Sequence, residues 1–328
     1  MCGIAGYWRN QGLYGEEILS SMTDVLTHRG PDDSGFWSDP DVGVALGHRR
    51  LSILDLSPEG HQPMFSVSDR YVIVFNGEVY NFSELRRRLE STGFRFRGHS
   101  DTEVILSAIE AWGLEVAVKQ FIGMFAFALW DRENRLLSLV RDRLGIKPLF
   151  YGWVSGALVF GSELKAIRAY PGFDNPVDRN ALTLLLRHNY IPAPYSIYEC
   201  IYKLMPGTIL QFDADTISTP RSLEDLSRRT LTYWSAREVA EQGAVQRYDG
   251  STSEAIRQLD ALLSNAIGIR MVADVPLGAF LSGGVDSSTV VALMQAQSDR
   301  PVKTFSIGFN ESKYDEAKYA KKVARHLG

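Results

Sequence analysis

Two short segments carry residues that could do chemistry, and the first is the N-terminus itself. Once Met1 is removed, the thiol of Cys2 would lie beside a free α-amino group. An α-amine has a pKa of about 7.7–8.0, so it can act as general base for a neighbouring nucleophile. Hydrolases with an N-terminal nucleophile work in this way. Cys2 alone is weak evidence, because many cysteines at position 2 have no catalytic role.

The second segment is a glycine- and serine-rich loop, residues 281–288, between an expected strand and an expected helix. Glycines let backbone N–H groups approach phosphate oxygens, and the start of the following helix adds positive potential. Ser282, Ser287 and Ser288 offer hydroxyl donors, and Asp286 is a candidate ligand for Mg²⁺. No Gly-Lys-Ser/Thr follows, so this is not a Walker A loop.

The elements that must position these two segments differ in type. Up to about residue 212 the chain is typical of a layered α+β domain with short strands and a few amphipathic helices. The expected strands are 71–75, 124–130, 136–140 and 157–160, and the expected helices are 16–26 and 102–112, the second following Ser100 and Asp101 as an N-cap pair.

Residues 213–251 are polar and punctuated by turn signals, which predicts a connecting segment with local structure. Beyond it, helices at 253–270, 287–297 and from 315 alternate with strands at 277–281 and 302–309. The first of these helices should turn Ile256, Leu259, Leu263 and Ile267 inward. Such alternation predicts a parallel α/β sheet over 252–328. Two strands do not make a sheet covered on both faces, so we expect this domain to be truncated.

Several ordered motifs accompany Cys2 and the loop, at residues 28–32, 48–53, 76–81, 100–103, 141–149 and 161–165. Together they make the chain resemble the class II glutamine amidotransferases, and specifically the glutamine-dependent asparagine synthetases, over nearly its whole length. The resemblance implies a four-layer N-terminal-nucleophile hydrolase domain at 1–212, with antiparallel sheets between helices. It also implies the beginning of a parallel-sheet ATP-pyrophosphatase domain at 252–328.

The resemblance assigns roles in glutamine hydrolysis, and each role has a physical rationale. Arg50 would grip the α-carboxylate of glutamine, because a guanidinium binds a carboxylate bidentately. Asp101, with Glu78, would bind the α-ammonium. The side chain of Asn76 and the N–H of Gly77 would hold the oxyanion formed when Cys2 attacks. The backbone of the segment after Arg50 would complete the pocket wall, through Leu51, Ser52, Ile53 and Leu54.

The resemblance also assigns the loop to ATP. Backbone and hydroxyl groups of the loop would hold the pyrophosphate, Asp286 would serve Mg²⁺, and Ile307 would contact the adenine through its backbone. The implied ATP-site residues are Leu281, Ser282, Gly283, Gly284, Asp286, Ser287 and Ile307.

The implied reaction transfers ammonia from glutamine to aspartate activated by ATP as β-aspartyl-AMP, giving asparagine, AMP and pyrophosphate. We expect residues 1–328 to retain the glutaminase half and not to complete asparagine synthesis. Three alternatives remain open: amidation of another carboxylate, an autonomous glutaminase, and a non-catalytic protein that uses the fold for binding.

Composition limits the other classes of function. The 328 residues carry 35 basic and 39 acidic side chains, a net charge of −4, so no basic field points to nucleic acid or to a membrane. Two cysteines make a disulfide framework unlikely and fit a reducing cytoplasm, with Cys200 expected to be a small buried hydrophobe. No basic, apolar leader begins the chain, and no apolar stretch reaches the ~20 residues that span a bilayer. A homodimer is compatible with all of this.

Overall fold

A computed structural model describes residues 1–10, 12, 16–311 and 313–328. The chain divides into two compact units, Met1–Ala244 and Val245–Gly328. Among the described residues, no helix combines the length and the apolar composition that crossing a membrane requires.

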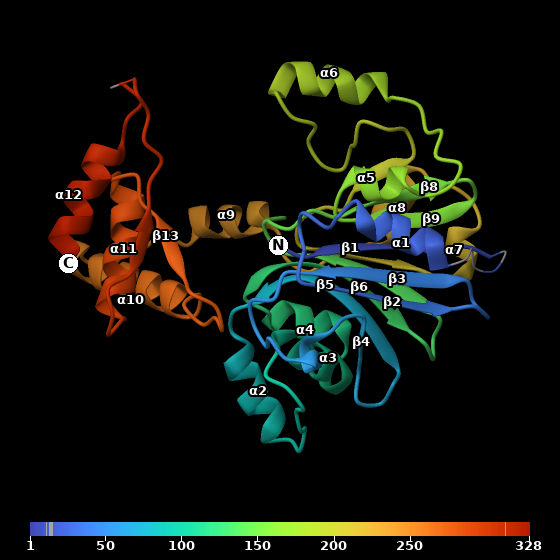
Figure 1. Cartoon of the computed structure of the whole chain (residues 1–328), viewed down its shortest axis with the longest axis horizontal. Helices are drawn as coiled ribbons and strands as arrows, with labels where there is room; N and C mark the ends of the chain where they lie inside the picture. The colour runs from blue at the N-terminus through green and yellow to red at the C-terminus, as the bar shows by residue number, and fades with distance from the viewer. Residues whose placement is uncertain (11, 13–15, 312) are drawn as a thin grey trace. The chain divides into compact units, whose positions relative to one another are not determined.

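The first unit contains two antiparallel sheets stacked between helices (Figure 1). One sheet has the order β10-β8-β9-β1-β3-β2, formed by Ile201–Lys203, Phe150–Val154, Ala157–Gly161, Gly3–Trp8, Val44–Arg50 and Asp33–Asp39. The other has the order β12-β11-β7-β6-β5-β4, formed by Thr230–Thr232, Thr208–Phe212, Leu136–Arg141, Gly123–Asp131, Tyr71–Val79 and Met64–Phe65. This confirms the expected antiparallel sheets between helices.

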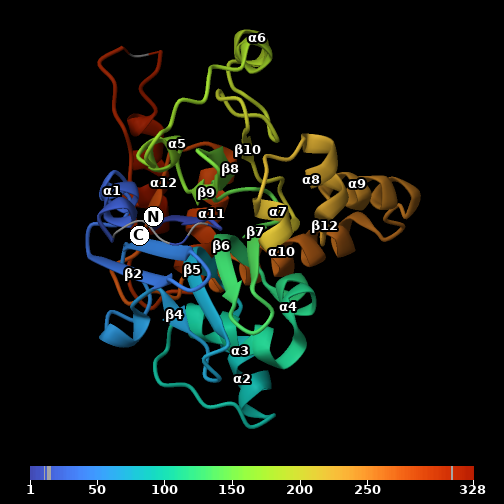
Figure 2. The same cartoon turned by 90° about the vertical axis from the view of Figure 1, so that its right-hand side faces the viewer.

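The outer layers are helical. Helices α1 (Glu16–Asp24) and α5 (Leu164–Arg168) cover the first sheet, and α2 (Phe82–Glu90), α3 (Asp101–Trp112) and α4 (Leu114–Gln120) cover the second (Figure 1). Helix α6 (Arg179–His188) buries only Ala181 and stands away from the layers (Figure 2). The rest of the unit includes α7 (Ala214–Ile217), α8 (Leu223–Arg229) and α9 (Ala236–Val245).

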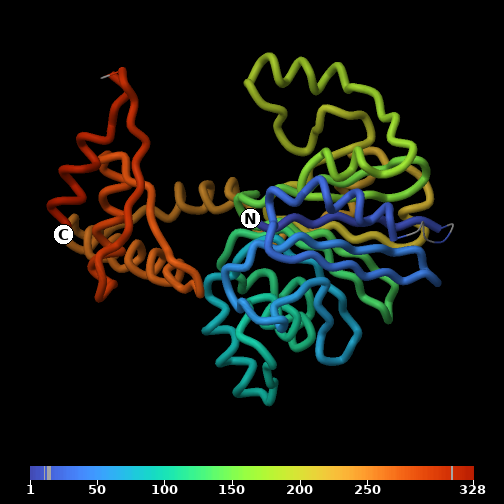
Figure 3. The backbone as a smooth tube through the Cα atoms, in the orientation of Figure 1, coloured from blue at the N-terminus to red at the C-terminus, as the bar shows by residue number. Residues whose placement is uncertain are grey.

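Apolar side chains explain the layering, because alternate residues of each strand face opposite sides of its sheet. One cluster fills the space between the two sheets, where Trp8 and Trp130 meet edge to face with ring centroids 5.0 Å apart. Two further clusters lie between each sheet and its helices. Strand β1 is therefore buried on both faces, and its trace runs through the middle of the unit (Figure 3). The residue directly before β1 is Cys2.

The stretch 213–251, predicted as a connection, includes helices α7 to α9 and strand β12, which pairs with β11. The boundaries at 212 and 252 remain predictions. The prediction that Cys200 is buried is wrong. The residue is exposed with φ +60°, because it lies at the sharp turn before β10.

The second unit comprises α10 (Thr252–Gly268), β13 (Gly278–Phe280), α11 (Val285–Ala296), β14 (Lys303–Phe305) and α12 (Ala317–Leu327). Its two strands pair in parallel, which confirms the expected βαβ arrangement. The inward face predicted for α10 is wrong at Ile256 and Leu259, which are 63% and 56% exposed. Periodicity defines an apolar face, but burial also needs an element that covers it. Strand β14 is also shorter than the predicted 302–309.

Candidate active site

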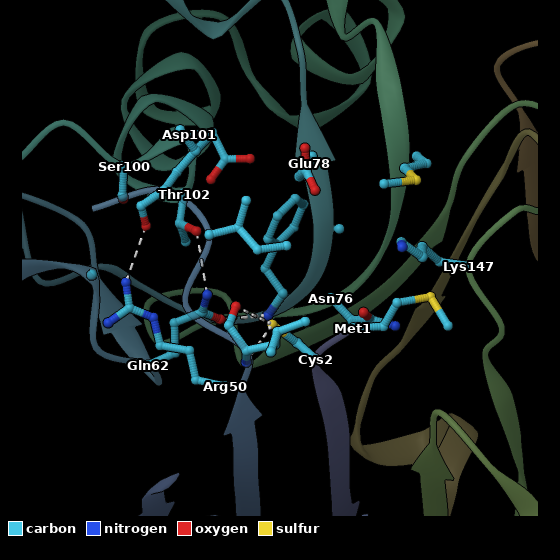
Figure 4. A pocket seen from close by; sticks show the side chains of 17 residues that line it. Met1, Cys2, Arg50, Gln62, Asn76, Glu78, Ser100, Asp101, Thr102 and Lys147 are labelled. Carbon is cyan, nitrogen blue, oxygen red and sulfur yellow. Dashed lines mark hydrogen bonds between the residues drawn. The ribbon is translucent and has the colours of Figure 1, made fainter. Parts of the chain in front are cut away.

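A pocket of about 190 Å³ brings together most of the residues predicted to bind glutamine (Figure 4). This volume is below the ~300 Å³ at which drug-sized sites begin, so it suits a ligand the size of an amino acid. Of the predicted set, only Ser52 is outside the lining, and its N–H donates to the Asp32 carboxylate at 2.8 Å. The lining is Met1, Cys2, Arg50, Leu51, Ile53, Leu54, Gly60, Gln62, Phe75, Asn76, Gly77, Glu78, Ser100, Asp101, Thr102, Met124 and Lys147.

The thiol of Cys2 lies against the backbone of Leu51. The N–H of Leu51 donates to Sγ at 3.4 Å, and the thiol donates to the Leu51 carbonyl at 3.7 Å. Burial raises the pKa of Cys2, while the hydrogen bond from Leu51 and the terminal ammonium oppose this rise. The resting thiol is therefore protonated and needs a base. Burial lowers the pKa of the α-amine of Met1, while the neighbouring Cys2 raises it and the positive charge of Lys147 lowers it.

Asn76 and Gly77 lie within strand β5, opposite Ala126 and Phe125 of β6. Asn76 is fully buried, and among the described residues neither Nδ2 nor Oδ1 of its side chain has a hydrogen-bond partner. A buried amide without partners costs free energy, so this side chain is available to a ligand. A Cβ on Gly77 would lie 2.6 Å from Phe125 Cα and overlap the Met124 carbonyl, so only glycine fits.

The strand that carries Asn76 is fixed by two side chains. His48 Nε2 donates to the Phe75 carbonyl at 3.0 Å, and the Phe75 N–H donates to Gln62 Oε1 at 2.7 Å. Burial lowers the pKa of His48 to about 3, so its ring stays neutral. The backbone next to Asn76 is therefore held by two uncharged side chains.

Arg50 ends strand β3 and is buried. Its guanidinium donates to the carbonyls of Leu54 at 3.2 Å and Ser57 at 3.4 Å, and also to that of Asp55. These bonds fold the segment after β3 around the guanidinium, which places Leu51 beside Cys2. Arg50 thus supplies a fixed positive charge to one part of the pocket.

Two carboxyl groups, those of Asp101 and Glu78, lie across the pocket from Arg50 (Figure 4). Asp101 is the first residue of α3, after the cap Ser100, and accepts the N–H of Val79 at 2.9 Å. Burial and the neighbouring Glu78 raise the pKa of Asp101 to about 7. Burial likewise raises the pKa of Glu78, while Lys147 and the terminal amine lower it. The pocket therefore carries two cationic side chains, Arg50 and Lys147, and two acidic groups, and Arg50 with the acidic pair matches the charges of an α-amino acid.

Several lining residues were missed by the sequence reasoning. Lys147 is 3% exposed, and burial lowers its pKa while Glu78 raises it. Its motif, residues 141–149, signalled the family but gave no role for the side chain. Gly60 and Gln62 carried no local signal, since their importance comes from contacts with Arg50 and Phe75. Ser100, Thr102, Phe75 and Met124 adjoin predicted residues or strands.

In the second unit, residues 281–284 form the loop between β13 and α11, and residues 285–288 are the first turn of α11. Gly283 has φ +84°, and Ser282 Oγ lies 2.9 Å from Ser287 Oγ. The N–H of Gly284 donates to Ser282 Oγ at 3.3 Å. The loop thus precedes a helix whose first turn holds Asp286, in agreement with the expected strand–loop–helix order.

The remaining predicted ATP residues flank this loop. Leu281 is buried, its N–H donates to Phe305, and its carbonyl accepts from Ser306 at 2.6 Å. Ile307, two residues after β14, is 69% exposed, which leaves it accessible. Among the described residues, no group of three or more His, Cys, Asp or Glu side chains could hold a metal ion. A lone Asp286 carboxylate suits Mg²⁺ bound chiefly by phosphate oxygens and water.

The chain matches two family models and is similar to curated relatives. Residues 1–222 match the model of the glutamine amidotransferase domain family, and residues 258–328 match the asparagine synthase model. A putative glutamine-hydrolyzing asparagine synthetase 2 of Methanocaldococcus jannaschii is 40% identical, covering 100% of this chain and 63% of that protein. The glutamine-hydrolyzing asparagine synthetase 3 of Bacillus subtilis is 35% identical, covering 97% and 50%. The chain thus spans between half and two thirds of these relatives.

A solved structure of glutamine phosphoribosylpyrophosphate amidotransferase from B. subtilis shares the fold. Its TM-score is 0.50 at 20% identity, and the match covers 66% of this chain and 48% of that one. The matched fold is that of the hydrolases with an N-terminal nucleophile.

Proposed function

Because the chain belongs to the family of glutamine amidotransferase domains, we propose that its first unit hydrolyses glutamine with Cys2 as nucleophile. One observation carries the proposal: a single pocket contains the thiol, the Arg50 cation, the Glu78 and Asp101 carboxyl groups, and the unpartnered amide of Asn76. Each of these side chains suits one chemical group of glutamine. Arg50 would bind the α-carboxylate and Asp101, with Glu78, the α-ammonium.

The proposed reaction begins after removal of Met1. The freed α-amine of Cys2 takes the thiol proton, and Sγ attacks the side-chain amide carbon of glutamine. Asn76 Nδ2 and the N–H of Gly77 donate to the oxyanion. When the tetrahedral intermediate collapses, the carbon–nitrogen bond breaks and ammonia leaves with the proton held by the α-amine. Water then hydrolyses the thioester to glutamate and regenerates the thiol.

Covalent labelling tests this proposal. An electrophilic glutamine analogue, such as a diazo ketone, should add one equivalent to Cys2, and free glutamine should protect against it. Mass spectrometry of the intact chain and its peptides should place the adduct at an N-terminal Cys2 that lacks Met1. Cys200 is exposed, so Cys200→Ala is the matched control and should label as fully as the wild type. Labelling that is lost in Cys200→Ala, or activity with Met1 retained, would overturn the proposal.

We further propose that the second unit binds ATP and that the whole protein amidates aspartate through β-aspartyl-AMP. The match of residues 258–328 and the names of the relatives support this extension. Asp286 would help to hold Mg²⁺, which would neutralise phosphate charge. A homodimer and a cytoplasmic location belong to the same proposal.

The acceptor can be tested separately from the glutaminase. The full-length protein with glutamine and ATP should release pyrophosphate and AMP when aspartate is added, with one asparagine formed per pyrophosphate. The alternative is another carboxylate as acceptor. A panel of carboxylates distinguishes the two, because pyrophosphate release with a different acid and not with aspartate would support the alternative.

A further inference from the structure

A network of charged side chains outside the pocket contacts the backbone of Cys2. Cys2 precedes the β1 ladder, and its carbonyl accepts a hydrogen bond from Arg29 Nε at 2.9 Å. Arg29 is 8% exposed, and its Nη1 donates to Glu163 Oε1 at 2.9 Å. A side-chain contact on this carbonyl therefore fixes the orientation of the residue that carries the nucleophile.

Glu163 is itself held by several groups. His28 Nε2 lies 3.0 Å from Oε1, and Lys165 Nζ lies 3.2 Å from Oε2. Desolvation favours the neutral acid, but hydrogen bonds from Arg29, His28 and Lys165 outweigh it and lower the pKa of Glu163 to about 2. The carboxylate is therefore ionised at any practical assay pH, and its bond to Arg29 is charge-assisted.

The position of Glu163 in the chain ties it to β1 a second time. The preceding residue, Ser162, donates its N–H to the Ile4 carbonyl at 2.9 Å and accepts the N–H of Ile4 at 3.0 Å. Residues 162 and 163 thus hold the N-terminal strand through its backbone and through Arg29. Glu163 does not line the pocket, so it has no direct contact with a ligand there.

We propose that Glu163 is a positioning residue for the glutaminase reaction, acting through Arg29 to fix the carbonyl of Cys2 and so the placement of its thiol and α-amine. This inference rests on the proposed function. The physical reason is the steep dependence of rate on geometry, since a misplacement of ~1 Å can cost ~10²-fold. Without the carboxylate, Arg29 is a buried cation that lacks its ion-pair partner and can turn away from Cys2.

A double-mutant cycle tests the coupling. We expect Glu163→Ala to lower kcat for glutamine hydrolysis by about tenfold, equivalent to ~1.4 kcal/mol, with KM within twofold of the wild type. Arg29→Ala should lower kcat at least as much. If Glu163 acts through Arg29, the double variant should match Arg29→Ala. Multiplicative losses, or a Glu163→Ala enzyme as active as the wild type, would overturn the proposal.

Two measurements separate positioning from damage to the fold. The rate of glutamine hydrolysis is divided by the amount of Cys2 that the glutamine analogue labels. Protein that has misfolded and does not label is thereby excluded from the comparison. Glu163→Gln keeps the size and one acceptor for Arg29, and should lose less activity than Glu163→Ala. If Glu163→Ala fails to fold, the cycle is run with Glu163→Gln and Arg29→Lys.

The matched control is Asp131→Asn, which weakens another arginine–carboxylate pair of the same unit, Arg70 to Asp131 at 2.7 Å, outside the pocket. It should leave kcat per labelled site unchanged. An equal loss in this control would overturn the positioning role. A wild-type enzyme that neither labels at Cys2 nor hydrolyses glutamine would instead overturn the proposed function.

Discussion

Gly60 offers a direct test of the carboxylate-binding role proposed for Arg50. Gly60 ends the short 3-10 turn Pro58–Gly60 and is buried. A Cβ at this position would overlap Arg50 Nη2 and would lie 2.7 Å from both Arg50 Cζ and the Asp55 carbonyl oxygen. The carbonyl belongs to the backbone and cannot turn aside. In Gly60→Ala the guanidinium must therefore leave its present place.

The expected magnitude follows from the bond that is lost. A hydrogen bond to a charged group contributes about 1.5–3 kcal/mol, and each ~1.4 kcal/mol is a factor of ten. We therefore expect KM for glutamine to rise by about 10- to 150-fold. The guanidinium would bind the α-carboxylate in the ground state and the transition state alike, so kcat should change by less than about threefold.

Steady-state release of glutamate from glutamine measures both constants. The matched control is Gly243→Ala in α9, where an added Cβ meets no atom within 4 Å. Alanine is the better helix former, so this control should keep its KM and lose no stability. If folded Gly60→Ala keeps a KM within twofold of the wild type, the predicted position of the carboxylate at Arg50 is wrong.

Three other outcomes are expected. Asn76→Ala removes the unpartnered amide, so kcat should fall by ~10²–10³ in the same assay, and an unchanged kcat would exclude it as an oxyanion donor. Burial and Glu78 raise the pKa of Asp101 to about 7, so its carboxylate is lost below that pH. KM for glutamine should therefore fall as pH rises through about 7. If the wild type and Asp101→Asn show the same pH dependence of KM, this prediction is wrong. Lys147→Met removes a buried cation, so calorimetry should show a melting temperature higher by about 2–4 °C; a decrease would show that the cation is stabilised.

The sequence predicted those helices and strands that depend mainly on residues adjacent in the chain. Helix α3 begins at Asp101 after the cap Ser100, whose hydroxyl accepts the N–H of Glu103, and it ends before Gly113 as expected. Capping bonds and a glycine stop involve neighbours in sequence, so they can be read without the fold. The strands predicted at β5, β6, β7 and β9 are confirmed, because their apolar runs and the turn residues that end them are also local signals, although β5 extends further than predicted.

Asn76-Gly77 shows where a local signal is overruled. In isolation this pair is a strong hairpin-turn signal. In the structure both residues lie inside β5, paired with β6, because the strand continues to Val79. The glycine meets a steric demand made by Met124 and Phe125, which lie about fifty residues away in sequence. Only the family resemblance, which compares whole motifs, pointed to the pair as a site.

Arg50 is a similar case. The sequence suggested its role, but not the hydrogen bonds that orient its guanidinium. Its hydrogen bonds to the carbonyls of Leu54, Asp55 and Ser57 occupy Nη1 and Nη2. A guanidinium has five N–H donors, so these three bonds leave donors for a carboxylate. The side chain is already ordered before a ligand arrives, which reduces the entropy cost of binding. Neither the carbonyl cradle nor the space left by Gly60 follows from residue type, because both depend on how the segment after β3 folds back on itself.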